Sequence, residues 1–494
     1  MNPPPPSPHE PAMKRTSFTA VCLATLLSLS QLFSSVAGQT IAKPEPELKN
    51  IGTRKLGVDW PIFLGPTQDS KSPETGIITK WTASKPRIVW TKELGTGYGA
   101  PTISRGRLFQ FDRFEDKARV YSLNAETGKQ LWQYEYATDY SDYFNYNNGP
   151  RCSPVVDGNR VYAFGVEGKL LCLTADEGKL LWQVDTKKDF AVVQNFFGVG
   201  STPVVEGDLL IVMVGGSPAW CQNLGAGALD RVEGDGSGIV AFDKYTGKVR
   251  YKITDELASY ASLKTATIDG RRWCLAFCRG GLVGFEPKSG KVDFEYPWRA
   301  KTLECVNAAV PVVVGNEVFI SETYGPGSSL LKVAPGNSEI VWKDDDRRRQ
   351  KAMMTHWNTP VYHNGYLYGS SGRHTENAEL RCIEWKTGKV MWSEPGLTRS
   401  SLLYVDGHFI CQAEYGQLIV FKANPEKYEP VSEIELQTPA VAGPVLGPAP
   451  KAELQAGRPL LKYPCWAAPV LSHGLLYVRG DERLVCLELI PEKS

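Results

Sequence analysis

The sequence predicts an all-β fold: an eight-bladed β-propeller of four-stranded antiparallel blades, closed by an N-terminal outer strand in the last blade. Two observations support this class. A unit of four short strands recurs with a period of roughly 40–50 residues, which is typical of propeller blades. The first and last units are also incomplete in complementary ways. An open array of sheets or a β-sandwich of short strands is the alternative, but an open array would leave strand edges exposed.

The clearest unit runs from Pro154 to Trp182. Its four apolar, β-branched or aromatic runs are separated by turns that contain Gly or Asp, a pattern typical of antiparallel strands. The turn before the last run contains Gly178, which we expect to adopt the positive φ that a bulged hairpin requires.

Two marks of this unit can be counted independently along the chain. A Gly-Lys pair precedes a large aromatic residue, four positions after the glycine, at Gly128/Trp132, Gly178/Trp182, Gly247/Tyr251, Gly290/Phe294 and Gly388/Trp392. A degenerate copy at Pro335-Gly336-Asn337 has its aromatic at Trp342. The third strands are expected at Arg119–Leu123, Leu170–Leu173, Ile239–Phe242, Leu282–Phe285, Leu330–Val333, Leu380–Ile383, Leu418–Phe421 and Leu484–Leu487. The count is therefore eight.

The two ends of the repeat region complement each other. Arg87–Leu94, which contains Trp90, has the pattern of an outer strand with no unit before it. The last unit has no fourth strand after Leu484–Leu487. We therefore expect the N-terminal strand to complete the last blade and close the ring.

The first residues predict export. Residues 1–38 have the form of a signal peptide, with Lys14-Arg15 before an apolar core and Ser35-Val36-Ala37 as a small-x-small cleavage site. The localisation predicted is periplasmic or extracellular, and no transmembrane span is expected after cleavage. Residues 39–86 form an N-terminal leader with an aromatic clip, in which we expect Trp60 and Phe63 to pack across the ring. Residues 87–494 form the propeller.

Composition excludes some function classes. The chain has 55 basic and 54 acidic residues, so no charge excess favours nucleic acid or an anionic membrane surface. Three cysteines, Cys172, Cys382 and Cys486, occupy the same repeat position in different units and are expected to be small buried residues. Since there is no C-x-x-C, a zinc or redox site has little support.

The connections from each outer strand to the next inner strand are expected to meet on one face, around the central channel. They contain aromatic and polar residues: Tyr143–Arg151, Val193–Gly198, Glu304–Asn307, Thr355–Asn358, Thr398-Arg399 and Tyr463–Trp466. Such a rim suits a flat, anionic small molecule or a peptide; the alternative is that these side chains bond neighbouring loops and plug the channel. Glu304, His356 and His374 are weak candidates for a metal site. Two insertions, 215–238 and 429–463, are expected at the surface.

The repeat core resembles the pyrroloquinoline quinone (PQQ) repeat family. The motif is seen in Asn124-Ala125-Glu126-Thr127-Gly128 to Trp132, and again in Trp-Lys-Thr-Gly-Lys-Val-Met-Trp at 385–392. That family includes quinoprotein alcohol dehydrogenases and the outer-membrane assembly lipoprotein BamB, all eight-bladed. The segment Trp60 to Pro66 is similar to the W-P-x-F-R-G-P leader of secreted PQQ-like propellers, with Leu64 where that leader usually has Arg. The resemblance implies that the tryptophans ending the outer strands dock onto neighbouring blades.

The resemblance leaves two functions open. The first is a secreted binding or scaffold module of the cell envelope, like BamB, with no cofactor and with a protein partner or a small molecule in the central funnel. The second is a PQQ-dependent alcohol or sugar dehydrogenase with calcium; in it, Asn148, Arg151 and Arg399 would hold the quinone carboxylates and Trp357 would stack on the quinone. The chain lacks the adjacent Cys-Cys pair of many quinoproteins. We therefore favour the first function, and whether the protein is an enzyme stays open.

Overall fold

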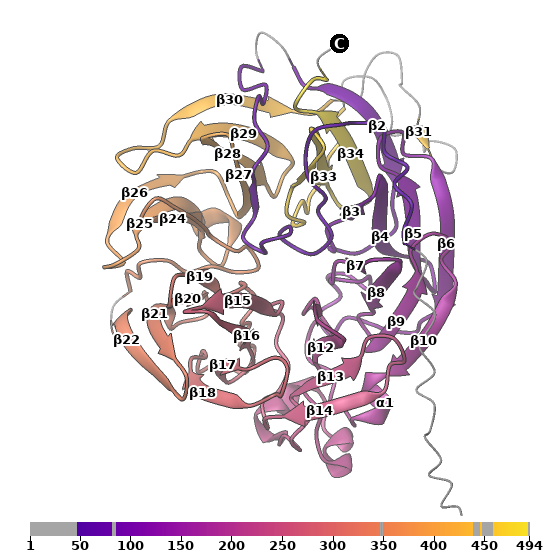
Figure 1. Cartoon of the computed structure of the whole chain (residues 1–494). Helices are drawn as coiled ribbons and strands as arrows, with labels where there is room; N and C mark the ends of the chain where they lie inside the picture. Colours follow the sequence, from indigo (N-terminus) through magenta and orange to yellow (C-terminus); the bar gives the residue numbers. More distant parts are fainter. Residues whose placement is uncertain are drawn as a thin grey trace, which may run out of the picture. The chain divides into compact units, whose positions relative to one another are not determined.

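Eight sheets are arranged in a ring around a central axis (Figure 1). The structure is a computed structural model that describes residues 47–81, 85–345, 347, 349–437, 445–446 and 458–492. Each sheet contains four antiparallel strands, so the predicted eight-bladed propeller is confirmed. The predicted signal peptide lies outside the described residues.

The first four blades follow one another along the chain. They consist of β3 (Thr102–Ser104), β4 (Arg107–Phe114), β5 (Lys117–Asn124) and β6 (Gln130–Ala137); β7 (Val155–Asp157), β8 (Arg160–Phe164), β9 (Lys169–Thr174) and β10 (Leu180–Asp185); β11 (Val204–Glu206), β12 (Leu209–Met213), β13 (Ile239–Asp243) and β14 (Val249–Ile253); and β15 (Lys264–Ile268), β16 (Arg271–Phe277), β17 (Gly281–Phe285) and β18 (Val292–Pro297). In each blade the last strand lies on the outside of the ring.

The other four blades contain the closure. They consist of β19 (Val312–Val314), β20 (Glu317–Glu322), β21 (Gly327–Ala334) and β22 (Asn337–Lys343); β23 (Val361–His363), β24 (Tyr366–Ser371), β25 (Glu379–Glu384) and β26 (Val390–Pro395); β27 (Ser400–Val405), β28 (His408–Ala413), β29 (Gln417–Lys422) and β30 (Pro430–Glu435); and β32 (Val470–Ser472), β33 (Leu475–Arg479), β34 (Arg483–Glu488) and β2 (Arg87–Glu93). β1 (Lys71–Ser72) and β31 (Val445–Leu446) extend the last two sheets as parallel strands.

The ring closes as predicted. β2 pairs antiparallel with β34, and Trp90 lies opposite Cys486. One expectation needs correction: the start of the 429–463 stretch, predicted as a surface excursion, is the outer strand β30 of the seventh blade. Much of the rest of that stretch lies outside the described residues.

Short helices occur only in connections within the described residues. α1 (Thr186–Asp189) follows β10, and η3 (Thr375–Asn377) lies between β24 and β25. The 215–238 insertion contains η1 (Ala219–Asn223) and η2 (Ala226–Arg231). Asp230 in this insertion accepts hydrogen bonds from Arg279 and Arg299, both at 2.8 Å, so the insertion is held against the fourth blade. No helix among the described residues is long and apolar enough to cross a bilayer.

Tryptophans on the outer strands dock onto the next blade. The indole Nε1 of Trp132 donates to the carbonyl oxygen of Ala175 at 3.0 Å. The other four such pairs are Trp90 to Ala125 (3.0 Å), Trp182 to Lys244 (3.1 Å), Trp342 to Trp385 (2.8 Å) and Trp392 to Asn424 (3.0 Å). This confirms the structural role that the resemblance implied.

The repeated glycine has two physical causes. Gly178 has a φ of 70°, which favours glycine. A Cβ at Gly178 would also lie 2.4 Å from the ring of Trp132 in the preceding blade. Gly247 and Gly388 have the same relation to Trp182 and Trp342, at 2.7 and 2.8 Å. We refer to this contact of an indole with the glycine of the next blade's turn as the indole–glycine latch.

The leader packs against one end of the channel. Trp60 is 1% exposed and pairs with Ile103 of the first blade, whereas Phe63 is half-buried. Leu64 has a φ of 63° and is buried. The amine of Lys264 donates to the carbonyl oxygens of Thr67 and Gln68 at 2.6 and 3.0 Å, and its burial lowers its pKa to about 8. The leader is therefore fixed across the ring, as its central path in Figure 1 also shows.

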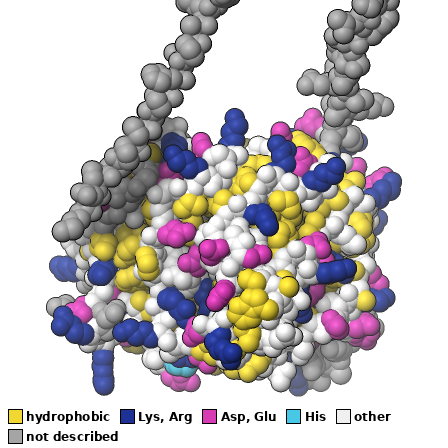
Figure 2. Space-filling view, turned by 90° about the horizontal axis from the view of Figure 1, so that it is seen from below, with side chains coloured by type: hydrophobic (Ala, Val, Ile, Leu, Met, Phe, Trp, Pro, Cys, Tyr) yellow, Lys and Arg dark blue, Asp and Glu magenta, His cyan; other side chains and the backbone are white. Residues whose placement is uncertain are grey.

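The described outer surface carries charges of both signs. Figure 2 shows Lys and Arg side chains interspersed with Asp and Glu on the face seen there. This agrees with the near balance of charge in the sequence.

The ion pair between Asp59 of the leader and His473 of the last blade, with Nε2 and Oδ1 3.1 Å apart, predicts a pH-dependent stability. The hydrogen bond to Asp59 raises the pKa of His473. Burial alone would raise the pKa of Asp59, but its hydrogen bonds, that to His473 foremost, lower it. A raised histidine pKa stabilises the fold below about pH 6.5, and this contribution is lost as the pH rises through the folded pKa. Because the pKa of Asp59 is lowered in the folded protein, the ion pair also loses its contribution to stability when the pH falls through that lowered pKa.

We therefore expect His473→Gln to lower the free energy of unfolding by about 0.5–1 kcal/mol at pH 5.5. At about 2 cal/mol/K per residue this lowers the Tm by about 1 °C. At pH 8.5 the two proteins should melt together. Thermal unfolding at both pH values checks this, and a larger difference at pH 8.5 would contradict it.

Candidate funnel site

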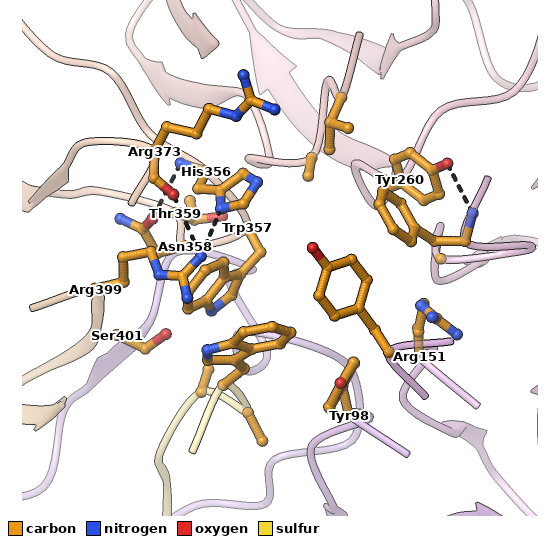
Figure 3. A pocket seen from close by; sticks show the side chains of 18 of the residues that line it. Tyr98, Arg151, Tyr260, His356, Trp357, Asn358, Thr359, Arg373, Arg399 and Ser401 are labelled. Atoms are coloured by element: carbon orange, nitrogen blue, oxygen red, sulfur yellow. Dashed lines mark hydrogen bonds between the residues drawn. The ribbon is translucent and has the colours of Figure 1, made fainter. Parts of the chain in front are cut away.

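A cavity of about 580 Å³ lies in the middle of the ring. Its lining includes Tyr98, Phe144, Tyr146, Arg151, Phe197, Thr202, Tyr260, Ser262, Glu304, Tyr324, His356, Trp357, Asn358, Thr359, Arg373, His374, Glu376, Arg399, Tyr463 and Trp466. Figure 3 shows side chains from several blades pointing toward this space. Every rim loop that the sequence analysis named contributes to the lining, so these connections do meet around the channel.

The leader supplies the other end of the cavity. Phe63, Leu64 and Ser70 belong to its lining, although they precede the first blade in the sequence. The cavity is therefore a funnel with a floor made by the leader.

Hydroxyl groups tie the blades together near the funnel. The Thr202 hydroxyl accepts from the backbone N–H of Ser153 at 3.2 Å, and the Ser262 hydroxyl accepts from that of Thr202 at 3.0 Å. Thr359 accepts in the same way from Val310 at 3.0 Å. Each acceptor lies just before an inner strand and each donor lies in the preceding blade, so the funnel wall is rigid at this level.

Arg399 lies in the funnel but is already neutralised. Its Nε and Nη2 atoms donate to Glu414 Oε2 at 3.0 and 2.7 Å. Glu414 is fully buried and also accepts from the indole of Trp466 at 3.1 Å. The guanidinium lies over the rings of Trp357 and Trp466, 4.6 and 5.1 Å from their centres. Arg399 is therefore part of the wall.

Arg151 has the same arrangement. Its Nη2 donates to Asp142 Oδ2 at 2.5 Å, and Asp142 is 2% exposed. Its guanidinium lies over Tyr98 and Phe197, at 5.6 and 5.9 Å. Asn148 does not line the funnel; its Oδ1 atom accepts from the backbone N–H of Asp142 at 2.8 Å.

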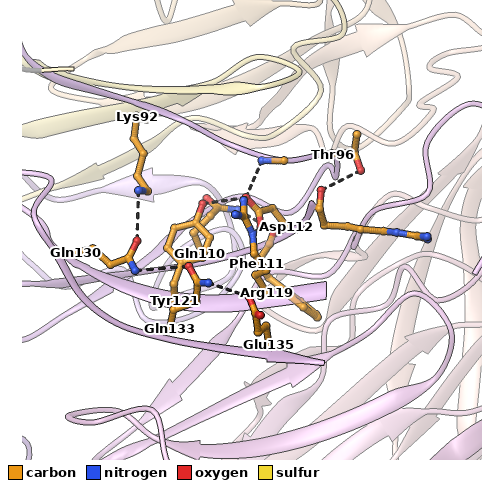
Figure 4. A network of polar contacts seen from close by, with 12 residues as sticks. Lys92, Thr96, Gln110, Phe111, Asp112, Arg119, Tyr121, Gln130, Gln133 and Glu135 are labelled. Carbon is orange, nitrogen blue, oxygen red and sulfur yellow. Dashed lines mark hydrogen bonds and ion pairs between the residues drawn. The ribbon is translucent and has the colours of Figure 1, made fainter. Parts of the chain in front are cut away.

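A buried carboxylate paired with arginine also supports the closing seam of the ring. Asp112 is fully buried; it accepts from Arg119 Nε and Nη2, each at 2.8 Å, and from the Tyr121 hydroxyl at 3.1 Å (Figure 4). Its Oδ2 also accepts from the backbone N–H of Gly95, just after β2, at 2.7 Å. The arginine–carboxylate pairs of the funnel therefore resemble a pair that serves the scaffold.

His356 is held neutral by its surroundings. Burial, and then the nearby charges of Arg399 and Arg373, lower its pKa to about 3. Its Nδ1 lies 3.5 Å from Arg399 Nη1 and its Nε2 lies 3.4 Å from the Tyr324 hydroxyl. Because a guanidinium only donates, Nδ1 is the acceptor and Nε2 carries the proton.

The three weak metal candidates, Glu304, His356 and His374, all line the funnel. However, the described residues contain no group of three or more His, Cys, Asp or Glu side chains placed to hold a metal ion. These three residues therefore do not form such a group.

Several residues of the lining were not predicted from the sequence. Tyr98 follows the closing strand in a stretch of turn glycines, and its ring lies 4.8 Å from that of Trp466. Arg373 adjoins the named His374, and its guanidinium lies 4.0 Å from the centre of the Tyr324 ring. Behind Tyr324, burial raises the pKa of the Glu322 carboxyl to about 8. A rule that each strand-to-strand connection on this face contributes side chains would have found Arg373.

Comparison with known proteins decides the family. A family model described as outer membrane protein assembly factor BamB matches residues 72–143 and 116–394. The chain belongs to this family. No curated protein sequence matches it significantly.

Two solved structures with the same fold as this BamB-family propeller are a BamB protein and an alcohol dehydrogenase. BamB from Moraxella catarrhalis is 12% identical, with a TM-score of 0.51, over 83% of this chain and 99% of that one. Quinohemoprotein alcohol dehydrogenase from Comamonas testosteroni is 12% identical, with a TM-score of 0.54, over 88% and 81%. At this identity the likeness shows the fold alone.

The donor set of this BamB-family funnel does not fit PQQ with calcium. PQQ is a flat polycarboxylate, yet two of the three funnel arginines, Arg151 and Arg399, are each paired with a buried carboxylate. The ring centres of Trp357 and Trp466 lie 4.6 Å apart, and the Arg399 guanidinium lies 4.6 Å from the centre of the Trp357 ring, so Trp357 already packs against two neighbouring side chains. Among the described residues, no three or more His, Cys, Asp or Glu side chains are grouped so that they could hold a metal ion.

The buried pair Arg399–Glu414 yields a stability prediction. Glu414→Gln leaves the guanidinium buried without its charge partner, and we expect it to lower the free energy of unfolding by about 3–5 kcal/mol. Adding Arg399→Met should restore more than half of this loss, because no uncompensated charge remains. Urea unfolding of both variants checks this.

The matched control is the exposed pair Lys179–Glu177, whose side chains are 72% and 58% exposed. Glu177→Gln should change the stability by less than about 0.5 kcal/mol. If Glu414→Gln behaved like Glu177→Gln, the pair would not be a structural part of the wall.

Proposed function

We propose that this BamB-family propeller is an exported binding module of the cell envelope and not a quinoprotein dehydrogenase. The observation that carries the proposal is the internal neutralisation of two of the three funnel arginines, Arg151 by Asp142 and Arg399 by Glu414. Because these two guanidiniums are already paired with buried carboxylates, they hold the funnel wall in one shape and are not free to bind an anionic cofactor.

The funnel has the general form of a ligand site. Its volume of about 580 Å³ lies within the range of about 300–1,000 Å³ that small-molecule sites occupy. Aromatic side chains and polar or charged side chains both line its walls. A small molecule or a side chain of a partner protein fits such a site. The predicted signal peptide supports the export part of the proposal.

The dehydrogenase alternative makes a contrary prediction about PQQ. If the funnel held PQQ at a hundredfold excess over its Kd, the ligand would stabilise the fold by about 2.7 kcal/mol. At about 2 cal/mol/K per residue this is a rise in Tm of about 3 °C. We expect no rise and no dye-linked oxidation of alcohols or sugars when PQQ and calcium are added. Thermal unfolding and a dye-reduction assay check this, and a rise together with dye reduction would refute the proposal.

Export makes a separate prediction. When the full chain is expressed in a Gram-negative host, the mature protein should begin near Gly38 or Gln39 and lie in the periplasmic or extracellular fraction. Leu26→Arg places a charge in the apolar core of the signal and should leave the chain uncleaved in the cytoplasm. N-terminal sequencing and cell fractionation check this. An uncleaved wild-type chain in the cytoplasm would contradict the proposed location in the cell envelope.

A further inference from the structure

We propose that the funnel binds a neutral oligosaccharide, an inference that rests on the proposed binding function and names its ligand class. Three features carry it: aromatic faces at the mouth, planar polar groups without ion-pair partners, and a charge balance that favours neither an anion nor a cation.

The aromatic faces lie on more than one side of the mouth. Tyr146 and Phe144 line the funnel although they are 65% and 41% exposed, and both contact Phe197. Tyr463, from the last blade, is 44% exposed and stacks on Tyr415 with ring centres 5.1 Å apart. The face of a sugar ring carries C–H groups of slight positive charge, which suit the negative face of an aromatic ring.

Polar groups with unused hydrogen-bonding capacity lie beside these rings. The carboxylates of Glu304 and Glu376 line the funnel, and neither has an ion pair or a side-chain hydrogen bond within the described part of the chain. The Arg373 guanidinium is exposed and, among the described residues, has no carboxylate within ion-pair distance. Sugar hydroxyls donate to carboxylates and accept from guanidinium, so one ligand type satisfies both. A wholly apolar ligand would instead desolvate these groups without replacing their hydrogen bonds.

The charge pattern disfavours charged ligands. An anion would meet the carboxylates of Glu304 and Glu376, and of the three funnel arginines only Arg373 has no carboxylate partner among the described residues. A cation that approached the exposed rings of the mouth would also meet the guanidinium of Arg373, which lies over Tyr324. The structure therefore favours an uncharged ligand that presents both apolar faces and hydroxyl groups.

The geometry also limits the size of the ligand. The leader residues Phe63, Leu64 and Ser70 line the floor, so a chain that enters from the rim ends there. A cavity of about 580 Å³ suits a short saccharide and not a long polysaccharide threaded through the ring.

Binding of neutral trisaccharides to the mature full chain tests the inference. The probes are cellotriose, maltotriose and chitotriose, with trigalacturonate as the anionic and spermidine as the cationic comparison. Titration calorimetry gives the Kd, and a change in tryptophan fluorescence that Trp357→Phe or Trp466→Phe abolishes would place the ligand beside these lining residues. We expect saturable binding of at least one neutral probe at one site per chain, and weaker or no binding of the charged probes.

Variants locate the binding. Tyr146→Ala removes an exposed ring and should weaken binding by roughly 3- to 10-fold, whereas Tyr146→Phe keeps the ring face and should retain most of the affinity. Trp220→Ala is the matched control, because Trp220 is 53% exposed and lies outside the funnel lining; it should leave the Kd unchanged.

The outcomes separate the two proposals. Binding of a neutral probe that Tyr146→Ala weakens and Trp220→Ala does not supports the saccharide class. Failure of all three neutral probes, or preferred binding of a charged probe at the same ring, overturns the saccharide class and leaves the binding module standing. A Tm rise with PQQ and calcium, together with dye-linked oxidation, would instead overturn the proposed function itself.

Discussion

The indole–glycine latch between neighbouring blades is the constraint on which the rest of the structure depends. A tryptophan of one outer strand donates its N–H to the next blade and lies against a glycine there, as Trp132 does with Ala175 and Gly178. The contact fixes both the distance and the rotation between successive sheets, because a buried ring has one position and its hydrogen bond has one direction. Where the repeat is degenerate, at Gly336, a Cβ would have no described atom within 4 Å, so this glycine meets no indole.

A rigid ring allows the inner loops to carry chemistry. Arginine side chains that would be mobile on a flexible loop are held by buried carboxylates, and their guanidiniums lie over aromatic rings. Two of the three funnel arginines, Arg151 and Arg399, are thus fixed and neutralised, whereas Arg373 is exposed. The family likeness leaves this chemistry undecided, since the same fold is found in a BamB protein and in an alcohol dehydrogenase. The side chains that line the funnel, and not the propeller fold itself, therefore determine the function.

The fold could be predicted from the sequence because its signals are local and repeated. Four short runs, a turn glycine and an aromatic recur often enough that single departures do not hide the count. The rim loops could be placed too, since connections from outer to inner strands must meet on one face; Arg151, Trp357 and Arg399 lie in the funnel for that reason. The hydrogen-bond and ion-pair partners of these residues could not be predicted, because no sequence pattern indicates the direction of a side chain in an irregular loop. Glu414 follows β28 with no pattern that points it at Arg399, and Asn148 lies in the same loop as Arg151 without reaching the cavity.

The pairing of β2 with β34 has a consequence for assembly. A strand near the beginning of the propeller finds its partner only when the last blade exists. Until then the earlier blades form an open arc with unsatisfied sheet edges, which are prone to pair with other chains. The pairing of β2 with β34 joins the two ends of the propeller, so blades that are distant in sequence belong to one closed ring. A chain that ends before its final blade would therefore expose unpaired strand edges and would not close into a smaller ring.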